Sequence, residues 1–595
     1  MTGAPPGTPS TRSSPSSSRG TGPPDVSSLA HPPLAEPPRN PVTTSSHLDR
    51  TSVSQRRDPS VPASSLPRTV TSARTDAPEE LSPDAVLPWD QGEPPAPPRE
   101  SATALPWRPP RDGHRPRALV SAEGSADFDM GRFAGWLRDA GVLDTGPIEL
   151  PGATVTLPYG MRLMRRFDTL VRSVYEDHAY EEYDYPLLVP SSVLEPSRSL
   201  MSLDGALVFA GDDEDWDAGR KRMVLTPTGE AAVYTHWAQM VRTARDLPIR
   251  AYRRTRYFRP ARAGRSVFRA IEALDVYEFQ ACFADGPAAR EGFTDAVAMA
   301  RRLCTEMHVP VLWATRPPWT NNTGVSEVTI GGDVPLPRGT TIQVGCVYQQ
   351  GDRFSSLYGV GHREDGVLHN THHVTGALTR RLVLMHLLLG MDSQGELLVH
   401  PDLAPVQVAV TLSGGDVDER TGAHALVKRL RQLGVTAELQ IAERKQVGRI
   451  HQRWRRQGVP LRVYLQPRRS PADRTRAVVV RADTRHEAVL LTDDAAQLAE
   501  LLPPALAEVG TGYLVRTREF VRRMSRPADS ADTVREVLAA RGVAVAPLRA
   551  TREVVTAVGS WGLGEVLGLR RMQHPAPCVV TGRPTFTSAY ISPRR

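Results

Sequence analysis

Apolar residues follow helical and strand periods over most of the chain beyond residue 127. The segment 161–178 is amphipathic with a helical period, and 286–307 predicts a second helix with Asp285 as its N-cap. Runs that predict strands lie at 185–190, 250–258 and 268–283. These patterns indicate a folded unit from 127 to 403.

A second pattern begins at 404–412 with a buried strand. Helices are predicted over 418–433, which Gly434 ends, and up to Gln457; strands are predicted over 437–441, 461–466 and 476–481. Alternation at this spacing predicts a small three-layer α/β domain over 404–505. The last unit, 506–595, has helical segments near 531–540 and 562–567 and a strand-like tail.

The first 120 residues are dominated by Pro, Ser, Thr, Gly and Arg. Such a segment cannot bury enough apolar surface to offset the entropy of ordering, so we expect a disordered tail over 1–120. An organellar presequence is the alternative interpretation, but the dense prolines oppose the amphipathic helix that it requires.

Length and charge narrow the classes of function. A chain of 595 residues exceeds the size of a single core, so several domains are expected. The net charge is +7, and the only lysines are Lys221, Lys428 and Lys445. Arginine is a permanent, bidentate phosphate ligand, so the composition favours phosphate handling over Schiff-base chemistry, although a GC-rich coding genome would produce the same bias.

The four cysteines are scattered and form no CxxC pair, which argues against a disulfide framework and against a cysteine zinc site. The most apolar stretch, 382–391, is too short for a bilayer crossing of roughly 20 residues. The N-terminus lacks the apolar segment of a secretory signal. We therefore expect a cytoplasmic protein without a membrane partner.

Neither a GxxxxGK[ST] loop nor a GxGxxG after a strand is present, so the two commonest nucleotide-binding loops are absent from the sequence. Five weaker signals occur instead. In chain order they are YPLLVP (185–190), LTPTGE (225–230), YFRPARAGRSVFRAIE (257–272), the run 343–360 with DRFSSLYGV, and GALTR (376–380) opening an apolar helix.

In this order the signals resemble the motifs of class II (IIa) aminoacyl-tRNA synthetases, most closely the prolyl-tRNA synthetases of the archaeal and eukaryotic type. WRRQGVPLRVYLQPR (454–468) is similar to a segment of their anticodon-binding domain, and CVVTGRPTFTSAY (578–590) to their C-terminal appendage. The resemblance spans 127–595 and implies an α+β core with an antiparallel sheet flanked by helices, an α/β anticodon-binding-type domain and a small α+β C-terminal domain.

The resemblance also implies a reaction: ATP-dependent adenylation of proline or a relative, then transfer to tRNA, by a homodimer using ATP with Mg²⁺. Arg259 would hold the α-phosphate and the substrate carboxylate, and Arg380 the γ-phosphate, as the catalytic pair. Arg265 or Arg269 would meet the β- and γ-phosphates, and Gln343 would contribute to the nucleotide site. The amino-acid pocket would consist of Thr228, Glu230, Arg259 and Tyr348.

Several positions depart from the family pattern. The altered positions in the core are Ala261, Ala273, Gly331, Cys346, Val347, Tyr348, Thr375 and Leu378, and those in the anticodon-like domain are Arg455, Tyr464 and Arg469. Of the family's zinc cysteines only Cys578 remains, so we expect no zinc there. Gly331 stands where the family has an acid, and Tyr348 where it has a histidine.

Three hypotheses are therefore open. The chain is a prolyl-tRNA synthetase-like ligase, a diverged paralogue that adenylates another amino acid for a biosynthetic pathway, or a non-catalytic regulatory protein that binds tRNA or an amino acid. Fold resemblance alone does not choose between them, because function depends on the site.

Overall fold

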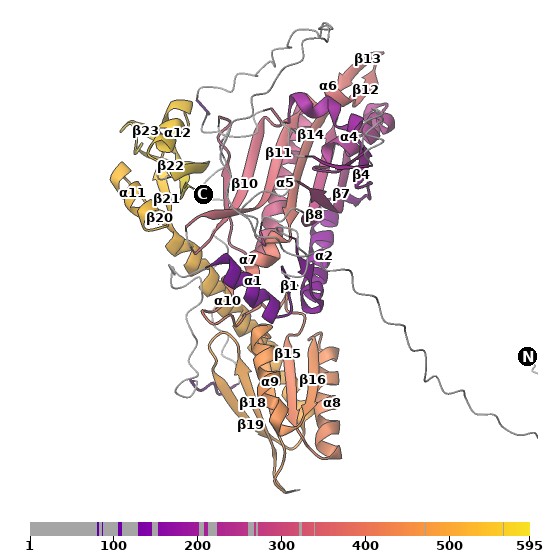
Figure 1. Ribbon diagram of the computed structural model, residues 1–595, viewed down its shortest axis with the longest axis vertical. Coiled ribbons are helices and arrows are strands. Elements are labelled where there is room, and N and C mark those ends of the chain that lie inside the picture. The colour runs from indigo at the N-terminus through magenta and orange to yellow at the C-terminus, as the bar shows by residue number, and fades with distance from the viewer. Residues whose placement is uncertain are drawn as a thin grey trace, which may run out of the picture. The chain divides into compact units, whose positions relative to one another are not determined.

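The computed structural model describes residues 80–82, 86, 105–109, 129–145, 153–201, 207–211, 223–259, 267–268, 272–319, 324–337, 339–470, 472–562 and 564–594 (Figure 1). Most of the Pro/Ser-rich segment and the predicted loop residues Ala261, Arg265 and Arg269 lie outside these residues.

The largest sheet in the described part of the chain has eleven strands in the order β20-β21-β23-β22-β9-β10-β11-β14-β8-β7-β3. The strands of its core part are β3 (Glu181–Glu182), β7 (Ile249–Phe258), β8 (Glu272–Phe283), β9 (Leu312–Thr315), β10 (Val328–Pro335), β11 (Thr341–Gly351) and β14 (His372–Thr379). From β9 to β7 every neighbouring pair is antiparallel, which confirms the predicted antiparallel core.

Long helices cover this sheet. They are α2 (Pro158–Asp177), α5 (Gly286–Glu306) and α7 (Arg381–Leu389), with α1 (Met130–Asp139) nearby in the same apolar core. The predicted Asp285 N-cap is confirmed, because its carboxylate accepts the N–H of Ala288 at 2.8 Å. Buried aromatic contacts, such as the edge-to-face pair Phe167–Tyr277, fasten α2 to β8.

Shorter elements surround the sheet. They are α4 (Glu230–Met240), α6 (Arg353–Tyr358), η2 (Ser191–Val193), η3 (Glu195–Ser199), η4 (Ala244–Asp246), the hairpin β12 (Gly361–Glu364) and β13 (Val367–Asn370), the pair β1 (Leu143–Asp144) and β2 (Val155–Thr156), and the three-stranded sheet of β4 (Leu188–Pro190), β6 (Met223–Leu225) and β5 (Val208–Ala210). The strand β6 leads directly into α4 through the LTPTGE segment, which makes this turn important for the site below.

The second unit is built on a five-stranded sheet. Its elements are β15 (Val408–Ser413), α8 (Val417–Gln432), β16 (Ala437–Ala442), α9 (Arg444–Arg456), β17 (Leu461–Gln466), β18 (Thr475–Arg481), β19 (Glu487–Thr492), η5 (Ala495–Leu501) and α10 (Leu502–Met524). β15 pairs in parallel with β16 and β17, as strands joined through helices do.

Alternate residues of β15 face opposite sides of this sheet. Val408 and Val410 pack in one apolar cluster with α8 and α10, and Ala409 packs in another with Trp454 of α9. The predicted three layers are therefore present.

The C-terminal elements extend the core sheet. They are β20 (Ser525–Pro527), α11 (Ala531–Ala539), β21 (Val543–Pro547), α12 (Arg552–Ser560), β22 (Gly564–Pro577) and β23 (Pro584–Pro593), and β22 meets β9 at Leu569 and Thr315. The helix predicted near 531–540 is confirmed by α11. The helix predicted near 562–567 is wrong, because α12 ends at Ser560 and a strand begins at Gly564.

Within the Pro/Ser-rich segment, residues 80–82, 86 and 105–109 are described. The backbone of Arg108 forms an isolated β-bridge with Glu487, and that of Glu80 forms one with Thr551. The Trp107 indole N–H donates a hydrogen bond to the Glu508 carboxylate. No helix in the described part of the chain combines the length and apolar content that a bilayer crossing requires.

Candidate active site

The turn from β6 into α4 places Glu230 at the first position of the helix, where the helix dipole favours a negative charge. The Glu230 side chain is nevertheless buried, with only 8% of the residue exposed. Its carboxylate accepts a short hydrogen bond from the Thr228 hydroxyl. The predicted pair Thr228 and Glu230 therefore forms one polar unit.

Beneath this turn lies a buried ion pair between two neighbouring strands. Arg253 of β7 faces Glu278 of β8 in register, and its Nη2 and Nε lie 3.1 and 3.2 Å from Glu278 Oε2. The same oxygen accepts the Tyr257 hydroxyl, and the Gln280 amide at 3.0 Å. Both charged side chains are almost completely buried, so these hydrogen bonds are needed to offset the cost of removing the two charges from water.

Gly229 allows the turn to approach this ion pair. A Cβ at position 229 would lie 1.8 Å from Glu278 Oε2 and 2.0 Å from Arg253 Nη2, so no side chain fits. Two carboxylates, Glu230 and Glu278, consequently lie close together. Burial, followed by the neighbouring Glu278 charge, raises the pKa of Glu230.

Tyr348 of β11 lies on the same face of the sheet as Gln280 and Glu278, because it pairs with Thr375 of β14, which pairs with Gln280. The nearby Cys346 and burial raise the pKa of the Tyr348 phenol, and the charge of Glu230 contributes to the same shift. The surroundings of Glu230 thus include a phenol and a thiol, and both groups favour their neutral forms.

Position 331, opposite Cys346 in register, has no side chain of its own. A Cβ there would lie 2.2 Å from the guanidinium of Arg316, so that group fills the space. Arg316 pairs with the buried Asp333 at 2.6 Å and donates to the Leu567 carbonyl at 2.5 Å. An arginine bound to the C-terminal strand β22 therefore occupies the space beside Gly331.

Arg259 follows the last residue of β7 and is exposed. Its Nη2 lies 3.4 Å from the carbonyl oxygen of Pro227, and the N–H of Phe258 donates to the Thr226 carbonyl at 3.1 Å. These contacts bring Arg259 beside the turn that carries Thr228 and Glu230.

Arg380 follows the end of β14 at the same end of the sheet, because Thr379 pairs with Val276 at the start of β8 and Phe258 of β7 pairs with Glu272. Its guanidinium is buried and donates to the Thr154 hydroxyl at 2.7 Å.

Gln343 lies just beyond the pair Gly345–Leu378, next to the junction of β14 and α7. Its backbone carbonyl oxygen accepts a hydrogen bond from the Arg381 guanidinium, at 3.0 Å. The structure thus places Arg380 and Gln343 at one end of the sheet, on strands two and three positions from the strand that precedes Arg259. It groups Thr228, Glu230 and Tyr348 around the buried ion pair.

Comparison with known proteins gives a consistent result. No family model matches the chain. The proline–tRNA ligase of Pyrococcus horikoshii is 25% identical over 345 residues, which cover 56% of this chain and 71% of that protein. The enzyme of the same name from Thermococcus kodakarensis is 24% identical over 419 residues, covering 68% and 84%. That from Pyrobaculum calidifontis is 27% identical over 394 residues, covering 65% and 78%.

The fold agrees with these relatives. A crystal structure of prolyl-tRNA synthetase from Cryptosporidium parvum, complexed with halofuginone and AMPPNP, superimposes with a TM-score of 0.69 at 17% identity, over 78% of this chain and 94% of that one. The chain is a diverged relative of the prolyl-tRNA synthetases.

Some substitutions that set this synthetase relative apart have a structural counterpart. Thr375 is buried and donates to the Phe279 carbonyl at 3.0 Å. Leu378 is fully buried in the apolar core. In the C-terminal unit, Cys578 Sγ accepts the N–H of Arg549 at 3.4 Å. Ala261 and the side chain of Ala273, like Arg265 and Arg269, lie outside the described part of the chain.

Sequence reasoning about this synthetase relative missed the residues Arg253, Tyr257, Glu278, Gln280 and Arg316. A signal existed for four of them. Arg253 and Tyr257 share one face of β7, and Glu278 and Gln280 share one face of β8, so polar residues recur at every second position of two buried strands. Arg316 gave no such local signal.

Removing the buried carboxylate should destabilise the protein strongly. Glu278→Ala leaves Arg253 charged and unpaired in the interior, and we expect a loss of about 3–5 kcal/mol in the free energy of unfolding. Urea denaturation followed by circular dichroism measures it. Glu306→Ala, which removes one of the two carboxylate partners of the exposed Arg302, is the control and should cost about 0.5 kcal/mol or less. Equal losses in the two variants would contradict the assigned role of the buried pair.

Proposed function

We propose that the chain is a prolyl-tRNA synthetase-like ligase, which adenylates proline or a related amino acid with ATP and transfers it to tRNA. The observation that carries the proposal is the Glu230 carboxylate. It is buried and accepts from the Thr228 hydroxyl, and among the described residues no basic side chain donates to it. The exposed Arg259 contacts the same turn at the Pro227 carbonyl oxygen.

The amino-acid pocket follows from this arrangement. A buried carboxylate without a cationic hydrogen-bond partner is an acceptor for the ammonium group of an amino acid. Glu278 is already neutralised by Arg253, so Glu230 is the carboxylate left to pair with substrate. Tyr348 would close the pocket from β11. Arg259, next to the turn, would hold the carboxylate end of the same substrate.

The chemical step requires positioning and charge stabilisation. An oxygen of the substrate carboxylate attacks the α-phosphorus of ATP, the new O–P bond forms, and the bond to the bridging oxygen breaks to release pyrophosphate. Arg259 would stabilise charge on the α-phosphate, Arg380 and Gln343 would contribute to the nucleotide site, and Arg265 or Arg269 would meet the outer phosphates.

Mg²⁺ supplies charge neutralisation on the phosphates when bound with ATP. Asp275, a carboxylate at this end of the sheet, is paired with Arg254 at 2.6 Å, so we expect the ion to be held mainly by phosphate oxygens.

We assign the catalytic core to 127–403, the tRNA-contacting unit to 404–505 and the prolyl-type C-terminal unit to 506–595, and we expect a homodimer from the resemblance. Helix α9 supports a nucleic-acid contact, because it carries basic residues and no acid. Its exposed cations include Arg444, Arg449 and Arg453. Of the altered positions in this unit, Arg455 lies 3.4 Å from Glu396, which reduces its contribution to a basic surface.

ATP–pyrophosphate exchange, screened across the amino acids, tests the proposal. We expect exchange with proline or a close relative. Arg259→Ala should lower the exchange rate about 100-fold or more, because a charge-stabilising group at the reacting phosphate is lost. Arg290→Ala, an exposed arginine on α5, is the control and should leave the rate unchanged.

Exchange that depends on an unrelated amino acid would instead support a paralogue serving a biosynthetic pathway. The absence of exchange with every amino acid would favour a binding protein and would refute the ligase proposal.

The raised pKa of Glu230 predicts a pH dependence for amino-acid binding. Protonation removes the charge that pairs with the substrate ammonium, and a raised pKa means that this occurs at a higher pH than for an ordinary glutamate. KM for the amino acid should therefore rise as the pH is lowered from about 8 to about 5. The rise should begin at a higher pH than it would for a glutamate with an ordinary pKa.

Glu230→Gln is the matched variant. Its KM should be about 10-fold higher or more at neutral pH, because a charged hydrogen bond is lost, and the pH dependence should flatten. The same slope in wild type and variant would show that Glu230 is not the titrating group.

The basic face of α9 predicts a separation of the two half-reactions. The double change Arg449→Glu and Arg453→Glu should raise KM for tRNA in the charging assay and reduce its salt dependence, because phosphate contacts release counterions. Amino-acid-dependent exchange should remain at the wild-type rate, since the helix belongs to another unit. Loss of exchange, or unaltered charging, would contradict this assignment.

A further inference from the structure

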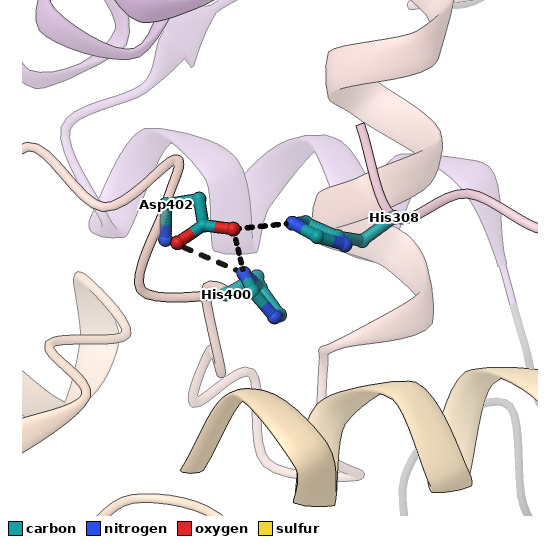
Figure 2. A group of neighbouring side chains, drawn as sticks. All are labelled: His308, His400 and Asp402. Carbon is teal, nitrogen blue, oxygen red and sulfur yellow. Dashed lines mark hydrogen bonds and ion pairs between the residues drawn. The ribbon is translucent and has the colours of Figure 1, made fainter. Parts of the chain in front are cut away.

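Three potential metal ligands come together from two distant segments, as Figure 2 shows. His308 lies just beyond the end of α5 in a left-handed conformation with φ of 55°. His400 and Asp402 lie in the loop between α7 and β15. This cluster is separate from the amino-acid pocket and from the C-terminal Cys578.

The spacing of the donor atoms suits a tetrahedral ion. His308 Nε2 lies 2.9 Å from Asp402 Oδ2, and His400 Nδ1 lies 3.5 Å from the same oxygen. The ligand atoms of all three residues lie within 4.8 Å of one another. In a tetrahedral zinc site with bonds of about 2.0–2.1 Å, neighbouring ligand atoms are about 3.3 Å apart, so the two measured separations bracket the required one.

The hydrogen bonds also fix where one lone pair points. The backbone N–H of Asp402 donates to His400 Nδ1 at 3.3 Å, so this nitrogen is the acceptor of the ring and carries its lone pair. The same nitrogen lies 3.5 Å from Asp402 Oδ2, a second electron donor. A cation bound by both atoms would replace the Asp402 N–H as the partner of this lone pair.

A buried imidazole holds the two segments in place. The ring of His386 on α7 accepts the N–H of His400 through Nε2 at 3.1 Å, which leaves Nδ1 to donate to the Met307 carbonyl at 3.0 Å. Tyr513 of α10 stacks on His386 with ring centroids 4.4 Å apart and donates to its carbonyl oxygen at 2.8 Å. The backbones that carry both histidine ligands are therefore positioned by one residue.

Solvent reaches the cluster from one side. The side chains of His308 and His400 are 14% and 8% exposed, whereas that of Asp402 is 67% exposed. A site with three protein ligands and an open side leaves the fourth coordination position to water.

We propose that His308, His400 and Asp402 bind a divalent transition-metal ion of the zinc type. Two imidazoles and one carboxylate match the ligands that zinc prefers over magnesium or calcium, which take oxygen ligands. The ion would link the end of α5 to the loop before β15. The inference does not depend on the proposed ligase function.

The test uses the full chain without an affinity tag, after removal of metal with a chelator. Isothermal titration with ZnCl₂ should show one equivalent binding with a Kd of about 1 μM or tighter, and MgCl₂ at the same concentration should show none. Asp402→Asn and His308→Gln should each weaken zinc binding about 10-fold or more. His424→Ala, an exposed histidine on α8, is the matched control and should bind as wild type does.

Circular dichroism of the metal-free variants establishes that they are folded; Asp402→Asn is the decisive variant, because its side chain is mostly exposed. Zinc should also raise Tm in wild type and in His424→Ala, but not in Asp402→Asn. Failure of wild type to bind zinc at micromolar concentration, or binding that is unchanged in Asp402→Asn, would overturn the proposal.

Discussion

The buried ion pair between Arg253 and Glu278 is the interaction around which the candidate active site is arranged. Two charges in an apolar interior persist only when every remaining donor and acceptor is satisfied. Here one oxygen of Glu278 receives the guanidinium, a phenol and an amide. Burial, followed by the charge of Glu278, disfavours the charged form of Glu230, and a substrate ammonium would stabilise that form.

The antiparallel sheet explains how residues far apart in the chain reach one place. Arg259 follows β7 and Arg380 follows β14, and the shared neighbour β8 brings the ends of these strands to the same end of the sheet. Strands fix side chains more precisely than loops do, which suits chemistry that depends on placing phosphate and carboxylate oxygens. The Arg380 guanidinium is buried and donates to Thr154, so it has to bind its phosphate from a buried position.

The sequence predicts those features that are local. The helix caps at Asp285 and Gly434, and the short motif with Thr228 and Glu230, are determined within a few residues, and the structure has each of them. The strand at Gly564 was predicted as helix, because its apolar spacing fits both periods. What decides it is pairing with β23 and β9, where a side chain on Gly568 would lie 2.5 Å from Ala314.

Long-range register explains the other residues that the sequence did not predict. Arg253 and Glu278 are 25 residues apart, and a bulge interrupts the register of their strands beyond Thr255, so the pairing is not evident from spacing. His308 and Asp402 are 94 residues apart and meet only because the end of α5 lies beside the loop between α7 and β15. The roles of Arg259 and Arg380 came from the resemblance and remain predictions.

The central claim is that Glu230 and Arg259 together present an amino acid to ATP. Mass spectrometry of the full chain, incubated with ATP, Mg²⁺ and an equimolar mixture of amino acids, tests it most directly. The account predicts a single enzyme-bound aminoacyl adenylate, of proline or a close relative, that is absent when Glu230 is replaced by glutamine. An equal yield of adenylate from the Glu230→Gln variant, or no adenylate from the wild-type chain, would contradict it.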